Sequence, residues 1–336
     1  MTAKKSEEIE ELKEKINEMA SQLNELKEEQ KQLNELLEEK NNIIDNYYEN
    51  FNILFLMFDL KSKSVLKLTQ DMCQLLLDFI VNVCEKHKIS YWLDFGTLLG
   101  AVRHNGFIPW DDDIDLGMMR KDYDYFLEVI KEEIKNNNLE DFLSVSINRI
   151  YKLKNNKDSL IAFIQISYMD TQGKKYLLAG LDVFCYDYIT KNQKDIEKLF
   201  YAEKNKYHRS IINGEPREEA IKPYMEALNV DLNEGIYIIP GIENVRSKYD
   251  KRYKFVVFKY EDVFPLQKLV YNNKYYLCPN NFHKFLTVMY GDYMTIPRSI
   301  KHHQRLFNMI KNYDIEELFE IHIKKMKDIN NKMKLY

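Results

Sequence analysis

The stretch Ile108-Pro109-Trp110-Asp111-Asp112-Asp113-Ile114-Asp115-Leu116-Gly117 decides the fold of this chain. Apolar residues flank and interrupt the acids, which favours a partly buried β-strand from Asp111 to Gly117. Side chains alternate along a strand, so one face would carry Asp111, Asp113 and Asp115, and the other Asp112, Ile114 and Leu116. Carboxylates on one face of a buried strand repel one another unless a cation joins them.

The acidic face predicts a site for a hard divalent cation. Mg²⁺ or Mn²⁺ prefers oxygen ligands, and Mg²⁺ typically takes one or two protein carboxylates and fills its other positions with water and substrate phosphates. An Asp-x-Asp pair on a strand supplies that number. The residues alone leave a second interpretation open, in which Pro109 and the acids form a polar surface turn or a helix cap.

Gly96 and Thr97 lie a short way upstream, where a short β-rich run ends and a turn followed by a short helix over 97–104 is expected. Exposed backbone N–H groups and a hydroxyl at such a turn can receive a phosphate. Arg103 can add a bidentate clamp. Neither the Gly-Thr turn nor Arg103 alone is a specific indication of a phosphate site. We interpret them as phosphate-binding candidates because they lie within twenty residues of the acids.

The N-terminal part of the chain predicts one long helix, since residues 5–50 contain no Gly or Pro and are rich in Glu, Lys, Leu, Gln and Asn. A heptad seam runs along it, with position a at Ile9, Ile16, Leu23, Gln30, Leu37 and Ile44 and position d at Leu12, Met19, Leu26, Leu33, Lys40 and Tyr47. Such a seam requires a partner helix, so we expect a coiled-coil homo-oligomer, with a single exposed or folded-back helix as the alternative. We assign residues 1–60 to this arm and 61–336 to a catalytic domain.

The rest of the chain has the pattern of an α+β domain. Helical patterns are expected over 64–88, 121–135, 192–208, 280–290 and 303–335, and β-rich segments over 143–153, 159–169, 176–188, 236–239, 253–258 and 268–277. We therefore expect a mixed sheet flanked by helices.

Composition indicates which partners and which cellular compartment to expect. Among 336 residues the formal charge is only −4, so no global field indicates a nucleic-acid partner. The four cysteines are scattered and form no CxxC pair, which favours a reduced, cytoplasmic chain without structural zinc. No apolar signal region and no run of about 20 apolar residues is present, so we expect neither export nor a membrane span. Peripheral association with the inner face of a membrane is compatible with this composition.

The segment from Tyr91 to Tyr123, with Leu-Asp-Phe-Gly-Thr-Leu-Leu-Gly-Ala-Val-Arg and Ile-Pro-Trp-Asp-Asp-Asp-Ile-Asp, resembles the signature of the LicD family, which includes phosphocholine transferases and fukutin-like glycan enzymes. Phe264-Pro-Leu and Tyr290-Gly-Asp-Tyr-Met-Thr-Ile-Pro297 resemble its second conserved region. The likeness spans roughly 66–304 and excludes the arm. It implies a nucleotidyltransferase-like fold and transfer of a group such as phosphocholine or ribitol phosphate from a CDP-linked donor to a hydroxyl of a lipopolysaccharide or cell-wall glycan.

The resemblance also implies roles for individual residues. Asp113 and Asp115 would be the metal ligands, and Asp182, in Gly-Leu-Asp-Val-Phe, the third carboxylate, which completes the metal site or accepts the proton of the acceptor. Cys185 stands where that motif usually has Pro, which weakens the match at Asp182. Asp111 and Asp112 remain alternative general bases.

Two other functions stay open at this point. One is a nucleotidyltransferase that attaches a nucleotide to its acceptor, and the other is a coiled-coil scaffold whose domain binds a glycan or nucleotide without turnover. Lys152 and Lys154 are weaker phosphate-binding candidates, and we interpret the adjacent His302 and His303 as a surface or substrate-edge pair rather than as metal ligands.

Overall fold

The computed structural model describes residues 2–57, 65–152, 158–170, 176–191, 195–244, 255–295 and 315–334. Lys154, His302, His303 and the first part of the helix expected over 303–335 lie outside them. The helices are α1 (Thr2–Met57), α2 (Val65–His87), α3 (Phe95–His104), α4 (Arg120–Asn136), α5 (Ile196–Ile212), α6 (Arg217–Ala220), α7 (Lys222–Leu228), α8 (Tyr260–Val263), α9 (Phe282–Tyr290) and α11 (Ile315–Met333).

The strands form one large sheet and two hairpins. They are β1 (Trp92–Leu93), β2 (Ile114–Met119), β3 (Leu143–Ser146), β4 (Arg149–Lys152), β5 (Asp158–Ile161), β6 (Ile164–Met169), β7 (Leu177–Ile189), β8 (Val230–Asp231), β9 (Tyr237–Pro240), β10 (Phe258–Lys259), β11 (Gln267–Tyr271) and β12 (Lys274–Cys278). The large sheet has the order β1-β2-β7-β6-β3, with β8 and β9 also paired to β7 and β10 to β9. The pair β2 and β7 is parallel and the other pairs are antiparallel, so the predicted α+β class with a mixed sheet is confirmed.

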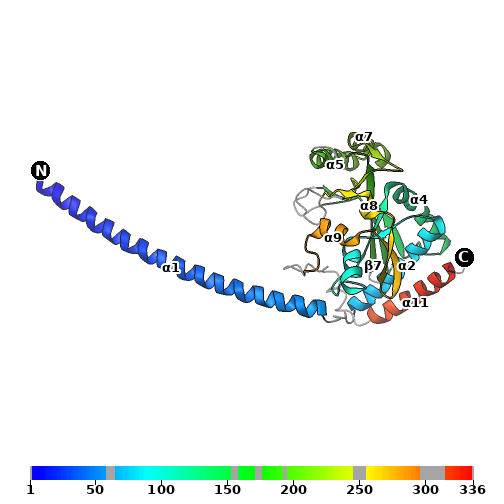
Figure 1. Ribbon diagram of the computed structural model, residues 1–336, viewed down its shortest axis with the longest axis horizontal. Helices are drawn as coiled ribbons and strands as arrows, with labels where there is room; N and C mark the ends of the chain where they lie inside the picture. Colours follow the sequence, from blue (N-terminus) through cyan, green and yellow to red (C-terminus); the bar gives the residue numbers. More distant parts are fainter. Residues whose placement is uncertain are drawn as a thin grey trace. The chain divides into compact units, whose positions relative to one another are not determined.

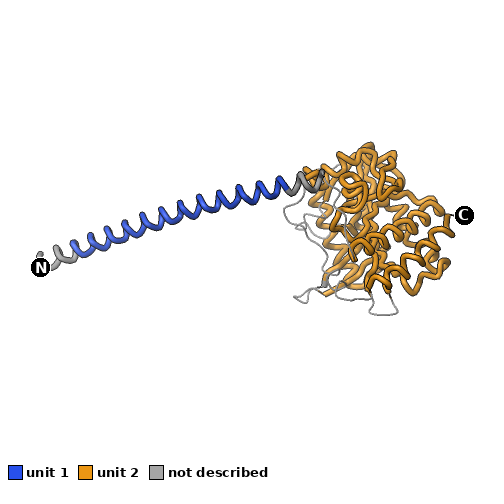
Figure 2. Tube along the Cα trace, turned by 90° about the horizontal axis from the view of Figure 1, so that it is seen from below, with its two compact units in different colours: residues 1–59 blue, residues 60–336 orange. Residues whose placement is uncertain are grey.

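The chain divides into two compact units, Met1–Asp59 and Leu60–Tyr336 (Figure 2). The long helix expected at the N-terminus is confirmed as α1. In the second unit the nearly continuous buried run of β7 occupies the middle of the sheet, as a strand covered on both faces requires. Helix α2 lies against β7, and α11 packs along α2 (Figure 1). Within the described part of the chain, no helix has the length and apolar content that crossing a membrane requires.

The structure divides or shortens several predicted elements. The strand expected over 111–117 begins only at Ile114. The β-rich segment expected over 143–153 is divided into β3 and β4, the one over 159–169 into β5 and β6, and the one over 268–277 is the hairpin β11–β12. Asn272 and Asn273 both have positive φ at the turn of β11–β12, as a two-residue type I′ hairpin turn requires. Asparagine tolerates that conformation, so the Asn-Asn pair was the signal for this turn.

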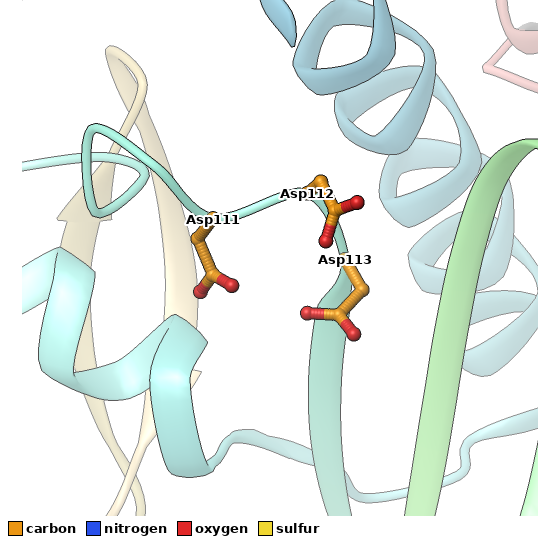
Figure 3. Close-up of side chains that lie close together, drawn as sticks. All are labelled: Asp111, Asp112 and Asp113. Atoms are coloured by element: carbon orange, nitrogen blue, oxygen red, sulfur yellow. The ribbon is translucent and has the colours of Figure 1, made fainter. Parts of the chain in front are cut away.

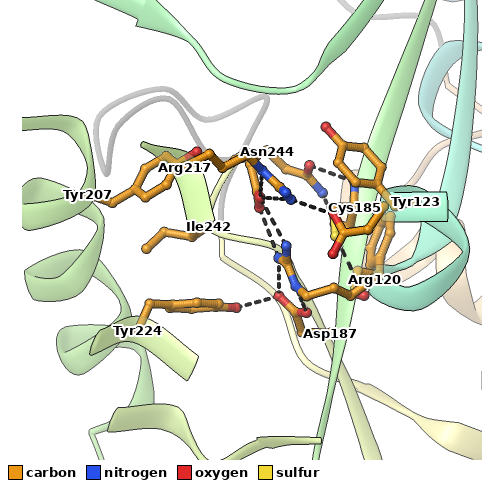
Figure 4. Close-up of polar contacts among 12 residues, drawn as sticks. Arg120, Tyr123, Cys185, Asp187, Tyr207, Arg217, Tyr224, Ile242 and Asn244 are labelled. Atoms are coloured by element: carbon orange, nitrogen blue, oxygen red, sulfur yellow. Dashed lines mark hydrogen bonds and ion pairs between the residues drawn. The ribbon is translucent and has the colours of Figure 1, made fainter. Parts of the chain in front are cut away.

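A second apolar core lies under α5, α6 and α7 and joins the sheet through a buried network of charges (Figure 4). Arg120, the first residue of α4 and only 2% exposed, donates to Asp187 on β7 at 2.5 and 2.8 Å and to Glu243 at 2.9 and 3.0 Å. Tyr224 on α7 donates to Asp187 at 2.8 Å. Arg217 on α6 donates to Glu243 at 2.8 Å. Burial alone would raise the pKa of Glu243, but the two arginines outweigh it and hold that pKa well below its ordinary value.

Lys204 on α5 is buried close to this network and donates to the carbonyl oxygen of Ile242. Burial outweighs the attraction of Glu243 and lowers the pKa of Lys204 to about 7. The unfolded chain, with a lysine pKa near 10.5, therefore binds more protons than the folded chain between these two values. It follows that Lys204 lowers stability below pH 7 and that this penalty shrinks as the pH rises.

We expect the free energy of unfolding of the wild type, relative to Lys204→Met, to rise by roughly 1–3 kcal/mol between pH 7 and pH 9. Denaturant titrations of both proteins across this range measure it. Lys206→Met is the matched control, because the Lys206 side chain is 58% exposed and pairs with Glu203. A difference between the wild type and Lys204→Met that stayed flat with pH would contradict the assignment of a depressed pKa.

Candidate active site

The acidic site is built on the parallel pair β2 and β7. In their register Asp115 lies directly beside Asp182, and Gln165 on β6 lies on the other side of Asp182. Residues that pair in this way project from the same face of a sheet. Gln165 Nε2 donates to Asp182 Oδ1 at 3.2 Å. Two carboxylates that are 67 residues apart in the sequence thus share one face of the sheet.

The N-terminus of α3 is bonded to this face at Asp115. The N–H of Gly96 donates to Asp115 Oδ2 at 3.1 Å, and the N–H of Asp115 donates to Thr97 Oγ1 at 2.8 Å. The N–H of Asp94, the residue that caps the helix, donates to the carbonyl oxygen of Asp115 at 3.0 Å. The bond from Gly96 orients the Asp115 carboxylate, and the other two bonds hold the Asp115 backbone. The phosphate-binding role expected for Gly96 and Thr97 stays a prediction.

Gly96 lies close to two of the acids. A Cβ atom at this position would lie 2.9 Å from Asp111 Oδ2 and 3.5 Å from Asp115 Oδ2. The carboxylates of Asp111 and Asp115 therefore both reach the first turn of α3. Thr97, at 2% exposure, is buried beside them.

The acids that precede β2 form a second part of the site (Figure 3). Asp111, Asp112 and Asp113 each offer an oxygen within 4.8 Å of the others, so their spacing suits an ion. Burial alternates along this segment, with Asp112 buried and Asp111 and Asp113 half-buried. The segment contains Asp113 from the expected ligand pair, while Asp115 follows on the strand.

Helix α2 explains why the strand starts late. Gln70 Nε2 donates to the carbonyl oxygen of Asp111 at 2.8 Å, and Cys73 Sγ lies 3.4 Å from the carbonyl oxygen of Asp112. Strand β1 pairs only with Leu116 and Gly117, so it provides no partner strand for the preceding acids. Side chains of helix α2 thus bind the backbone of this segment in place of a partner strand.

The electrostatics show how strongly the acids oppose one another. Burial raises the pKa of Asp115 well above its usual range, and Asp113, Asp182, Asp111 and Asp94 raise it further, in decreasing order. Burial also raises the pKa of Asp94 to about 7, although Tyr186 O–H, at 2.7 Å, and the N–H of Phe95 donate to it. A divalent cation would relieve this repulsion, so the donor set fits one.

Arg103 lies on the last turn of α3, seven residues from Gly96 and therefore on the same side of the helix about 10 Å along its axis. Its Nη1 donates to the carbonyl oxygen of Tyr293 at 3.0 Å. Burial lowers the pKa of Arg103, and Tyr290 opposes that shift. The guanidinium thus links α3 to the segment after α9, and its role as a phosphate clamp stays a prediction. Lys152, at the end of β4, is exposed.

Sequence reasoning missed several residues that hold this site together, namely Asp94, Tyr186, Gln165 and Gln70. Asp94 had a readable signal, because an aspartate directly before a short helix is a typical N-cap. The others had none, since their contacts join segments that are distant in the sequence.

Comparison with known proteins shows which family this part of the sequence resembles. Residues 88–224, which contain the aspartates of this site, match the family described as LicD/FKTN/FKRP, nucleotidyltransferase domain. This domain belongs to the LicD family. The predicted resemblance is therefore confirmed, and β2, β7 and α3 are elements of the LicD-family domain.

The LicD-family domain has named relatives. The chain is 29% identical over 257 residues to the lipopolysaccharide cholinephosphotransferase LicD of Haemophilus influenzae. The alignment covers 70% of this chain and 93% of that protein. It is 50% identical over 44 residues to the human ribitol 5-phosphate transferase FKRP, covering 13% of this chain and 9% of that one. An uncharacterized protein of Rickettsia typhi is 51% identical over 47 residues, covering 14% and 15%.

The close approach at Gly96 gives a prediction. In Gly96→Ala the new methyl group would displace the carboxylate of Asp111, so we expect transfer activity to fall about 10–100-fold. Stability should hold or rise by up to about 1 kcal/mol, because alanine favours the helix and Asp111 can turn away. Activity assays and thermal unfolding measure the two effects.

A double variant identifies the cause of the loss. If the methyl group acts by displacing Asp111, then Gly96→Ala should have little further effect on activity in an Asp111→Ala background. Losses that add fully in the double variant would show that Gly96 acts through some other contact.

Proposed function

We propose that this protein transfers a phosphate-bearing group, such as phosphocholine or ribitol phosphate, from a CDP-linked donor to a hydroxyl of a cell-surface glycan in a reaction that depends on Mg²⁺ or Mn²⁺. The observation that carries the proposal is the half-buried Asp115, which lies beside Asp182 on one face of the sheet and accepts a hydrogen bond from Gly96 at the N-terminus of α3. The names of the relatives, a cholinephosphotransferase and a ribitol 5-phosphate transferase, support this reaction class.

Asp113 and Asp115 would hold the cation, with Asp111 close to both of them. Asp112 offers a further oxygen beside Asp113. A bound divalent cation would supply charge neutralisation for the donor phosphates. The first turn of α3 would position those phosphates beside the acids, and Arg103 would hold their oxygens from the far end of the same side of the helix.

The acceptor hydroxyl oxygen would form a bond to the distal phosphorus of the donor, and the bond from that phosphorus to the oxygen of CMP would break. Asp182 would accept the hydroxyl proton, because it lies on the acidic face, is half-buried and is oriented by Gln165. Asp111 and Asp112 are the alternative bases. CMP leaves with the electrons of the broken bond.

The test is to incubate the full chain and an acceptor glycan with CDP-choline or CDP-ribitol, with Mg²⁺ or with EDTA. Release of CMP together with modified acceptor, lost in EDTA, supports the proposal. If CTP instead gives pyrophosphate and an acceptor that carries CMP, the protein is a nucleotidyltransferase and the proposed donor is wrong. Binding of a CDP-linked donor without turnover of any donor would favour the scaffold interpretation.

A further inference from the structure

Helix α1 leaves its heptad seam uncovered along its described length. The apolar seam residues from Leu12 to Tyr47 are 51–71% exposed in the single chain. Burying one such side chain fully contributes roughly 1.5–3 kcal/mol, so covering the whole seam is strongly favourable. The ion pairs within α1, such as Lys13 with Glu10 and Lys15 with Glu11, are exposed. Each contributes only tenths of a kcal/mol to the stability of the helix.

We propose that α1 pairs with α1 of a second copy of this chain as a parallel, in-register, two-stranded coiled coil. The composition of the seam favours two strands, because leucine occupies position d at Leu12, Leu26 and Leu33 while β-branched isoleucine occupies position a at Ile16 and Ile44. The partner helix we propose is that of a second copy, because in this register each seam residue faces its own counterpart. The polar seam residues Gln30 and Lys40 support this arrangement.

The polar seam residue Gln30 decides between the two orientations. In a parallel, in-register pair Gln30 faces Gln30 of the second copy, and the two amides can bond to each other. In a fully overlapped antiparallel pair Gln30 would face Leu26 instead, and its amide would lose its partner on burial. Lys40 faces Lys40 in the parallel pair, where its long stem lets the ammonium group reach water.

The residues that flank the seam give the same answer. The parallel register places Gln22 beside Lys27 and Glu29 beside Asn34 of the second copy, all pairs that can form hydrogen bonds. It also places Ile43 beside Tyr48, which extends the apolar contact. The antiparallel arrangement would instead place Lys27 beside Lys27 and Glu29 beside Glu29, and like charges at these positions repel. This pairing does not depend on the proposed reaction, and it makes the two catalytic units follow the same end of the arm.

The assembly state of the full chain tests the pairing. Light scattering should give about twice the 40.4 kDa of one chain for the wild type and one chain mass for Leu26→Lys/Leu33→Lys. The matched control is Glu28→Lys/Glu35→Lys, which adds two lysines on the outer side of the helix and should stay dimeric. A wild type that is monomeric at micromolar concentration, or a trimer, would overturn the proposal.

Cysteine cross-linking tests the orientation. All four native cysteines are buried, so an added thiol on the arm reacts selectively. In a parallel pair Leu12→Cys lies opposite its own copy and should form a disulfide-linked dimer. In an antiparallel pair the two thiols would lie roughly 50 Å apart. Disulfide formation between Leu12→Cys chains and Ile44→Cys chains after mixing would show the antiparallel arrangement and sink the parallel one.

Discussion

Asp115→Asn should lower kcat/KM for transfer by at least about 10³-fold, while the folded protein becomes as stable as the wild type or more stable in metal-free buffer. Asparagine keeps the volume of the side chain and an oxygen that can accept from the N–H of Gly96. It removes the negative charge that the cation and the donor phosphates require. Rates of CMP release and thermal unfolding in EDTA measure the two effects.

The opposite directions of these effects have one cause. Burial and the neighbouring acids raise the pKa of Asp115, which means that its charge costs folding free energy when no cation is bound. A residue that served only the fold would lose stability and activity together. Asp141→Asn, the same change at an exposed carboxylate, should alter neither. Full activity in Asp115→Asn would remove the basis of the proposed function.

Metal titration separates the two candidate ligand sets. A cation that binds only the folded protein stabilises it by an amount that grows with the logarithm of the ratio of cation concentration to Kd, so Mg²⁺ should raise the unfolding temperature of the wild type. Asp113→Asn should abolish this shift in either set, because Asp113 belongs to both the expected pair and the group formed with Asp111 and Asp112. Loss of the shift in Asp112→Asn but not in Asp115→Asn would assign the cation to the segment before the strand.

The period of an extended chain predicted that Asp111 and Asp115 share a face, and both carboxylates reach the first turn of α3. It did not predict that Asp112, expected on the opposite face, offers an oxygen within 4.8 Å of Asp111 and Asp113. Burial follows the alternation from Asp111 to Leu116, although the strand itself begins at Ile114. The first residue of β2 could not be predicted, since it depends on the hydrogen bond to the preceding backbone from Gln70, which lies on helix α2 far away in the sequence. The local sequence pattern thus predicts which side chains of the segment are buried, whereas the hydrogen bonds of its backbone depend on tertiary contacts.

Asp182 illustrates the same division. Its strand was recognisable from its apolar run, and its role was suggested by resemblance. Its place directly beside Asp115 depends on the parallel register of β2 and β7, which one strand alone does not determine. The buried ion pairs of Arg120 with Asp187 and with Glu243 were not predicted, because in the sequence each of these residues looks like an ordinary solvated charge.

Arg120→Met should lower the free energy of unfolding of the second unit by about 3–5 kcal/mol, which corresponds to roughly 6–20 °C in unfolding temperature. Methionine fills much of the space but leaves Asp187 and Glu243 buried with much less compensating charge. Lys121→Met is the matched control at the next position. The exposed Lys121 donates a hydrogen bond to Asn233 at 3.2 Å, so its loss should cost less than about 0.5 kcal/mol.

The pH dependence of this loss distinguishes a charge effect from a packing effect. In the wild type the pKa of Glu243 lies below its unfolded value, so the carboxylate contributes stability above about pH 4.5 that is lost as the pH falls through the folded pKa. Without Arg120, burial should raise that pKa, and the variant should then lose stability as the pH rises above about 4.5. The gap between wild type and Arg120→Met should therefore be wide at pH 7 and narrow near pH 4. A gap of constant size would mean that Arg120 stabilises the fold only by filling space.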